Sequence, residues 1–291
     1  MDHSPIVSPE SLYARLGSPD LRIVDVRWVM GSPGAGQLGY AAGHIPGAIF
    51  LDLDTDLAGR DGPGRHPLPV PADFRERLEG AGIGDADHVV VYDDVGGWIA
   101  ARLWWMLDNL GHERVRLLDG GLPAWIAAGF PVTAAAPEPR ARGQLSLLDA
   151  WTGVIDRADL TEGLGGFVLL DARGGPRYRG EVEPIDAVPG HIPTARSAPA
   201  DGNVGADGRM LPAAVLAERF GSLGATGEGG PVVTSCGSGV TACFNSLAMR
   251  VAGLPEPILY AGSYSDWSRA GMPIASGPEP GDPPGRQIGE R

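Results

Sequence analysis

The sequence predicts an α/β protein made of two similar domains, each a mainly parallel β-sheet flanked by helices. Three observations lead to this fold class. Short apolar runs typical of buried strands alternate with helical apolar patterns, and landmarks of the first half return in the second half in the same order. The chain of 291 residues is also long enough for two ordinary domains, each with a full core.

The repeated landmarks stand 142 to 147 residues apart. They are an apolar strand ending in Asp-x-Arg, the tetrapeptide Gly-His-Ile-Pro, a second apolar strand followed by a tight loop, and a helix containing Trp. The paired anchor positions are Asp25 and Asp171, His44 and His191, Asp93 and Cys236, and Trp125 and Trp267. Four landmarks in one order at nearly one spacing predict an internal duplication.

Each copy alternates expected strands with expected helices. The expected strands lie within residues 21–28 and 88–93 in the first copy and 167–173 and 231–236 in the second. Helical apolar patterns cover 74–78, 99–110 and 240–251. Four tryptophans on helical apolar faces are expected in the core, namely Trp104, Trp105, Trp125 and Trp267.

Composition excludes several classes of function. The chain has 36 acidic and 23 basic residues, a net charge of −13, which argues against nucleic acid or an anionic membrane as the main partner. Two cysteines seven residues apart make no disulfide framework, and no signal peptide or long apolar span is present, so a cytoplasmic, reducing location is expected. The six histidines are scattered without zinc spacing, so no metal is expected.

The stretch around Cys236 carries the predicted chemistry. An apolar strand ends on this cysteine, two glycines follow within three residues, and a helical pattern then begins. Such a loop lets backbone N–H groups and the positive end of a helix dipole converge on one side chain. Because these groups stabilise thiolate, the reactive form of cysteine, we interpret Cys236 as a nucleophile rather than a buried core thiol.

Comparison of the two copies indicates which domain is expected to be catalytic, and comparison with cysteine phosphatases excludes one other class of enzyme. Asp93 stands where the first copy would need a thiol, so that copy is expected to be non-catalytic, packing against the second and lending side chains to the site. A cysteine phosphatase needs arginine six positions after the nucleophile, where this chain has Ala242. Cys243 is expected to be a packed core thiol, with a redox role left open.

The predicted domain boundaries follow from these assignments. A non-catalytic domain is expected over residues 1–137, a linker over 138–146 and the catalytic domain over 147–277. The linker lies in a region rich in Ala, Pro and Arg. Residues 278–291 are dense in Gly, Pro and charge and are expected to form a flexible tail.

The duplicated landmarks resemble those of the tandem rhodanese-type sulfurtransferases over about residues 6–275. The loop from Cys236 to Ala242 resembles the 3-mercaptopyruvate branch, since thiosulfate-preferring members carry basic residues where Gly237 and Ser238 stand. The resemblance implies that Cys236 takes a sulfane sulfur from 3-mercaptopyruvate as a persulfide and passes it to a thiol, cyanide or thioredoxin-like acceptor. It implies no metal or organic cofactor, and thiosulfate remains the alternative small anionic donor.

The resemblance also implies a hydrogen-bonded relay for the pyruvate enolate that sulfur removal leaves. Ser238 matches the family's loop serine, although a helix-capping role is the plain alternative. His66 matches its histidine and Asp54 its aspartate, with Asp52 or Asp56 as alternatives. His66 has no counterpart in the second copy, so it cannot be explained as a structural residue that both copies share.

The resemblance assigns the donor's carboxylate to Arg177, whose guanidinium suits a carboxylate geometrically, although an inter-domain salt bridge is the alternative. Many relatives carry a second basic residue nine positions on, where this chain has Asp186. Either Arg179 compensates or the carboxylate is held less tightly. The remaining loop residues expected to contact the donor are Gly237, Gly239, Val240 and Thr241.

Side chains that recur in both copies are expected to be structural, because one copy lacks the thiol. They are the Asp-x-Arg ion pairs, Asp25 with Arg27 and Asp171 with Arg173, and the turn histidines His44 and His191.

Overall fold

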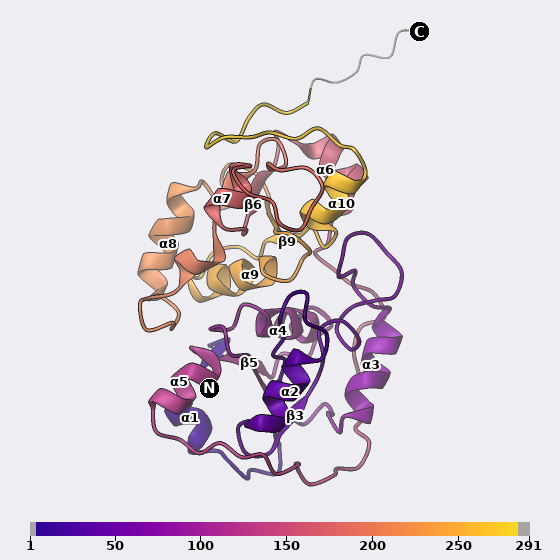
Figure 1. Cartoon of the computed structure of the whole chain (residues 1–291), viewed down its shortest axis with the longest axis vertical. Helices are drawn as coiled ribbons and strands as arrows, with labels where there is room; N and C mark the ends of the chain where they lie inside the picture. The colour runs from indigo at the N-terminus through magenta and orange to yellow at the C-terminus, as the bar shows by residue number, and fades with distance from the viewer. Residues whose placement is uncertain (1–3, 285–291) are drawn as a thin grey trace.

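A computed structural model describes residues 4–284 and contains two α/β domains stacked one on the other (Figure 1). The first lies at the bottom of the view and the second at the top, and helices α4 (Ala100–Asn109) and α9 (Ala242–Val251) meet between them. The predicted fold class is confirmed.

The first domain is built on a five-stranded parallel sheet in the order β1-β5-β4-β2-β3. Its strands are β1 (Ile6–Val7), β2 (Leu21–Asp25), β3 (Ala48–Phe50), β4 (His88–Tyr92) and β5 (Val115–Leu118). The central strands are apolar on both faces because helices cover both, which explains their unbroken Val/Ile runs. Besides α4, the helices of this domain are α1 (Pro9–Tyr13), α2 (Ala35–Ala42), α3 (Pro71–Gly80) and α5 (Gly121–Ala127).

Successive residues of each strand enter different cores. Val89 and Val91 of β4 belong to a core with side chains of α3 and α4, whereas Val90 and Tyr92 pack with Trp125 of α5 and side chains of α1. One face of the sheet is therefore turned toward the second domain and the other toward the outside of the molecule.

The second domain repeats this plan with four parallel strands in the order β7-β6-β8-β9. They are β6 (Val168–Asp171), β7 (Arg196–Ser197), β8 (Val232–Ser235) and β9 (Ile258–Leu259). The order matches β3-β2-β4-β5, and a single bridge from Val154 to Leu259 stands where β1 would lie. Besides α9, the helices are α6 (Arg157–Gly163), α7 (Gly175–Tyr178), 3₁₀ helix η1 (Ala200–Asn203), α8 (Ala213–Ser222) and α10 (Ser263–Arg269).

The core between the domains is continuous. Leu103, Trp104 and Leu107 of α4 share one buried cluster with Cys243 and Phe244 of α9. Since this cluster also contains Cys236, the predicted nucleophile stands where the domains meet.

The recurring polar residues have the structural roles expected of them. Arg27 pairs with Asp25 at 2.7 Å and Arg173 with Asp171 at 2.6 Å, and all four are buried. The Nδ1 atoms of His44 and His191 each lie 2.8 Å from a backbone carbonyl, that of Tyr40 and that of Tyr178. The four tryptophans expected in the core are buried, also as predicted.

The expected linker, 138–146, has no helix or strand and lies against the first domain, where Gly143 N–H donates to the Glu79 carbonyl at 2.8 Å. Residues 278–284 of the expected tail contact the second domain, with Thr194 N–H donating to the Pro280 carbonyl at 2.7 Å. The rest of that tail, 285–291, lies outside the described residues. The domain boundaries themselves stay predictions.

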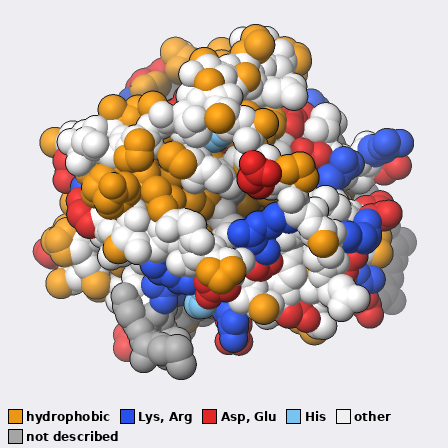
Figure 2. Space-filling view, turned by 90° about the horizontal axis from the view of Figure 1, so that it is seen from below, with side chains coloured by type: hydrophobic (Ala, Val, Ile, Leu, Met, Phe, Trp, Pro, Cys, Tyr) orange, Lys and Arg blue, Asp and Glu red, His pale blue; other side chains and the backbone are white. Residues whose placement is uncertain are grey.

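The surface seen from below in Figure 2 mixes acidic and basic side chains, with apolar side chains gathered in one part of the face. Among residues 4–284, no helix has the length and apolar character needed to cross a bilayer.

Candidate active site

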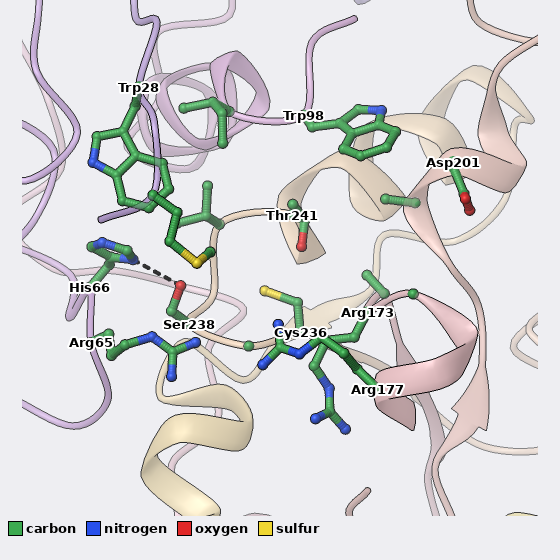
Figure 3. Close-up of a pocket in the computed structure, with 17 residues that line it drawn as sticks. Trp28, Arg65, His66, Trp98, Arg173, Arg177, Asp201, Cys236, Ser238 and Thr241 are labelled. Carbon is green, nitrogen blue, oxygen red and sulfur yellow. Dashed lines mark hydrogen bonds between the residues drawn. The ribbon is translucent and has the colours of Figure 1, made fainter. Parts of the chain in front are cut away.

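Cys236 directly follows β8 and lines a cavity of about 190 Å³ between the two domains (Figure 3). The residue is only 2% exposed, so its thiol is reached through that cavity. Its main chain is fixed at the start of α10, where Ser263 Oγ accepts its N–H at 3.1 Å and Tyr264 N–H donates to its carbonyl at 3.0 Å.

The loop after Cys236 presents backbone donors, as its sequence predicts. Gly239 N–H donates to Cys236 Sγ at 3.1 Å. The N–H groups of Ser238, Val240 and Ala242 have no hydrogen-bond partner among the described residues. Gly239 has φ +79°, and a Cβ there would lie 2.4 Å from the Ala261 carbonyl oxygen, so only glycine fits this turn.

The corresponding loop in the first domain surrounds a carboxyl group with backbone donors. Asp93, at the position of Cys236, is fully buried, and four backbone N–H groups donate to its carboxylate at 2.7 to 2.9 Å. Burial raises the pKa of this carboxyl, and the four donors oppose that shift. The donors belong to Val95, Gly97, Ile99 and Ala100. Their counterparts after Cys236 are the N–H groups of Ser238, Val240, Ala242 and Cys243.

The structure brings Ser238, His66 and Asp54 into one hydrogen-bonded row. His66 Nδ1 lies 2.8 Å from Ser238 Oγ, and His66 Nε2 lies 3.0 Å from Asp54 Oδ1 (Figure 3 shows the first contact). Burial lowers the pKa of His66 below its ordinary value, while the Asp54 charge raises it in part. The neutral ring therefore donates from Nε2 to the carboxylate and accepts the Ser238 proton at Nδ1.

Neighbouring contacts select Asp54 among the three possible aspartates. Its second oxygen accepts from Trp28 Nε1 at 2.8 Å, which fixes the carboxylate beside the histidine. Asp52 instead accepts the N–H groups of the turn that follows it, and Asp56 pairs with Arg77 at 3.3 Å.

The walls of the cavity differ in character. The first domain contributes mostly apolar side chains, among them Trp28, Met30, Trp98 and Ile99. The second domain contributes the Cys236 loop together with Arg173 and Arg177. Gly237, Val240 and Thr241 line the cavity as the sequence predicts, and Gly239 acts through its N–H.

The two predicted arginines have different positions. Arg177 lines the cavity, and its Nη2 donates to Glu183 Oε1 at 2.7 Å. Arg179 does not line it, is half-buried, and its Nε donates to Glu181 Oε1 at 2.7 Å. The expectation that Arg179 helps to bind the donor is therefore corrected, because its neighbour Glu181 holds the guanidinium at the surface.

A fully buried arginine of the first domain donates hydrogen bonds to two main-chain carbonyls of the site. Arg102 Nη1 donates to the Gly239 carbonyl and Nη2 to the His66 carbonyl, both at 3.0 Å. No carboxylate among the described residues pairs with it, and its Nε has no partner. Burial lowers the pKa of this guanidinium, while the Cys243 and Cys236 sulfurs favour its charged form.

Cys243 is a packed core thiol, as predicted. It is fully buried, its Sγ–H donates to the Gly239 carbonyl at 3.3 Å, and burial raises its pKa to about 12. Within residues 4–284, no group of three or more His, Cys, Asp or Glu side chains is arranged to hold a metal ion.

Comparison with known proteins agrees with this architecture. The rhodanese-like domain family matches twice, over residues 8–128 and 156–270. The chain belongs to the rhodanese family. The second match contains the Cys236 loop and the first contains Asp54, His66 and Asp93, so the cavity of this rhodanese lies between its two family domains.

Similar proteins are sulfurtransferases. A Pseudomonas aeruginosa protein described as a probable 3-mercaptopyruvate sulfurtransferase is 46% identical, over 95% of this chain and 100% of that protein. A rat thiosulfate sulfurtransferase is 34% identical, over 91% of this chain and 90% of that protein. The solved 3-mercaptopyruvate sulfurtransferase of Leishmania major has a TM-score of 0.82 and 31% identity, over 93% of this chain and 75% of that chain. The prediction that this protein is a sulfurtransferase is confirmed.

Sequence reasoning missed several side chains of the site, among them Trp28, Arg65, Trp98 and Arg102 of the first domain and Asp201 of the second. Trp28, Arg65 and Trp98 belong to loops whose approach to the second domain no local pattern reveals. Arg102 left a signal, because it is a charged residue inside the apolar helix 99–110.

Proposed function

We propose that this rhodanese transfers a sulfane sulfur from 3-mercaptopyruvate to a thiol, cyanide or thioredoxin-like acceptor through a persulfide on Cys236. The observation that carries the proposal is the position of the Cys236 thiol, in a small cavity between free backbone donors and the Ser238–His66–Asp54 row. The volume of about 190 Å³ suits a donor of a few carbon atoms.

In the first half of the cycle, the Cys236 thiolate attacks the sulfur of the donor and an S–S bond forms as the C–S bond breaks. The electron pair of that C–S bond stays on the three-carbon fragment as pyruvate enolate. The donor's S–H proton, released as the persulfide becomes an anion, is taken up at His66 Nδ1, and the protonated His66 then donates to Ser238 Oγ. Ser238 turns its own proton to the enolate, which becomes pyruvate, and the His66 proton replaces the one that Ser238 has given up. In the second half, the acceptor attacks the outer sulfur, the S–S bond breaks, and the Cys236 thiolate returns.

The first domain supports the persulfide step by analogy. A persulfide extends one heavy atom beyond Sγ, as the carboxylate oxygens of Asp93 extend beyond its Cγ. Four backbone N–H groups stabilise that carboxylate. Three of their four counterparts after Cys236 are free, so an outer sulfur anion would find donors already in place.

Thiosulfate is the second candidate donor. It is favoured by Arg65 and Arg177, two of the arginines that line the cavity, which suit any small anion, and by the likeness to a thiosulfate sulfurtransferase. Two free thiols suit a reducing compartment, and we place the reaction in the cytoplasm.

The test compares sulfur release from both donors in the wild type, Cys236→Ser and Ser238→Ala, with Cys243→Ala as the matched thiol control. We expect Cys236→Ser to lose all transfer and Cys243→Ala to keep it. Ser238→Ala should lose about 100-fold or more with 3-mercaptopyruvate and little with thiosulfate, since only the former leaves an enolate. Equal losses with both donors would contradict the enolate role, and an active Cys236→Ser would remove the mechanism.

A further inference from the structure

Two guanidinium groups from different domains meet over the residue that follows Cys236. A Cβ on Gly237 would lie 2.8 Å from Arg65 Nη2 and 3.4 Å from Arg177 Nη1. Both arginines line the cavity, on the same side of the Cys236 loop in Figure 3. Gly237 thus leaves room for two positive groups that any larger side chain would push away.

Buried acids hold the two arginines together. Asp186 bridges them, since Oδ1 accepts from Arg65 Nη1 and Oδ2 accepts from Arg177 Nη2 at 3.1 Å. Glu183 also accepts from Arg177 Nε and Nη2. The two acidic side chains are 2% exposed and do not line the cavity, whereas both arginine side chains are 18% exposed and do.

This arrangement leaves each guanidinium with an uncommitted terminal nitrogen that faces the cavity. Among the described residues, neither Arg65 Nη2 nor Arg177 Nη1 has a hydrogen-bond partner, and these are the atoms closest to the open space at Gly237. The acids therefore neutralise the outer edges of the pair, while the inner edges still offer N–H donors and positive charge to an anion in the cavity.

The main chain of Arg65 is fixed on the second domain. Its N–H donates to Ser265 Oγ at 3.1 Å. Gly64 has φ +83°, and a Cβ there would lie 2.5 Å from the Gly262 carbonyl oxygen. Arg65 is thus presented by a rigid contact, one residue before the His66 of the proposed relay.

We propose that Arg65 is a specificity-determining residue that holds the anionic end of the sulfur donor together with Arg177, and that Asp186 is a positioning residue that aligns the two guanidinium groups. The inference rests on the proposed function and deepens it. Asp186 stands where the second basic residue was expected, and the missing positive charge comes instead from the first domain. A donor carboxylate held here would lie beside the Cys236 loop and next to His66, as transfer from 3-mercaptopyruvate requires.

The test measures kcat and KM for 3-mercaptopyruvate in Arg65→Ala, in the double variant Arg65→Ala/Asp186→Ala, and in Arg179→Ala. The last removes the same charge from an arginine outside the cavity. We expect Arg65→Ala to raise KM by about 10- to 100-fold, the loss typical of one charged hydrogen bond, with a smaller change in kcat. Arg179→Ala should keep the wild-type KM.

The double variant separates substrate binding from simple charge balance, because it restores the wild-type net charge without restoring the guanidinium. Its KM should stay as high as that of Arg65→Ala. A return to the wild-type KM would mean that Arg65 only neutralises Asp186, and would overturn the inference, as would an unchanged KM in Arg65→Ala.

A second measurement does not depend on turnover. Pyruvate, which keeps the carboxylate and lacks the sulfur, should protect Cys236 from iodoacetamide in the wild type and protect it at least about 10-fold less well in Arg65→Ala. If this difference appears in a protein that does not use 3-mercaptopyruvate, the inference stands and the proposed function falls. Equal protection in both proteins would overturn the inference alone.

Discussion

Replacing Asp93 by asparagine tests how strongly the loop shared by both domains binds an anion. Each carboxylate oxygen accepts two backbone N–H groups, at 2.7 to 2.9 Å. An asparagine keeps one such oxygen and places an NH₂ group against the other two donors. A buried donor left without an acceptor costs about 1–3 kcal/mol, so two cost about 2–6 kcal/mol. Removal of the buried charge offsets part of this, and we expect a loss of about 2–4 kcal/mol in the free energy of unfolding.

The matched control is Asp94→Asn, because this neighbouring carboxyl is exposed and its loss should change stability by no more than about 0.5 kcal/mol. Urea unfolding followed by hydrogen exchange of the peptide that contains residues 93–110 reports on the first domain alone. One pair of amides, either Val95 with Gly97 or Ile99 with Ala100, should lose protection in Asp93→Asn, because the asparagine oxygen can accept only the other pair. The reasoning is refuted if the variant unfolds within about 0.5 kcal/mol of the control, since the four contacts would then contribute nothing measurable.

Two further predictions concern titrating groups. Burial lowers the pKa of His66 below 6.5, so transfer from 3-mercaptopyruvate should keep its rate as the pH falls to 6.5 and decline only below it. Asp54→Asn removes the charge that raises this pKa and should move the decline to still lower pH; a wild-type rate that already falls above pH 6.5 would contradict this. Burial raises the pKa of Cys243 to about 12, so iodoacetamide at a pH of about 8 should alkylate Cys236 alone in the folded protein, as peptide mass spectrometry would show. Labelling of both thiols would contradict the core assignment.

The sequence predicted the features that depend on local pattern and on the repeat. The apolar runs at β4 and β8 are buried on both faces, so their composition alone identifies strands. The duplication aligned Asp93 with Cys236, and the structure places each of them directly after the corresponding strand, at the start of a loop that leads into α4 or α9. These predictions succeeded because each depends on residues adjacent in the chain or on a comparison of the chain with itself.

The residues that sequence reasoning missed depend on contacts between the domains. Arg179 was one of two explanations offered for the missing second positive charge, the other being a less tightly held carboxylate, yet it pairs with Glu181 at the surface. Arg65 is 112 residues away from Arg177 and reaches the same cavity from the other domain. No periodicity or spacing encodes this approach, because it arises from the packing of α4 on α9 and of the 62–66 loop on α10.

The buried guanidinium of Arg102 makes the two copies interdependent. This one side chain of the first copy donates hydrogen bonds both to the turn that follows Cys236 and to the loop that contains His66. A fragment containing only the second half would lack the Arg102 hydrogen bonds, the His66 and Asp54 side chains, and the aromatic side chains that line the cavity. The first copy, which has Asp93 where the second has Cys236, is therefore needed to complete the cavity, because neither half contains all of the residues that line it.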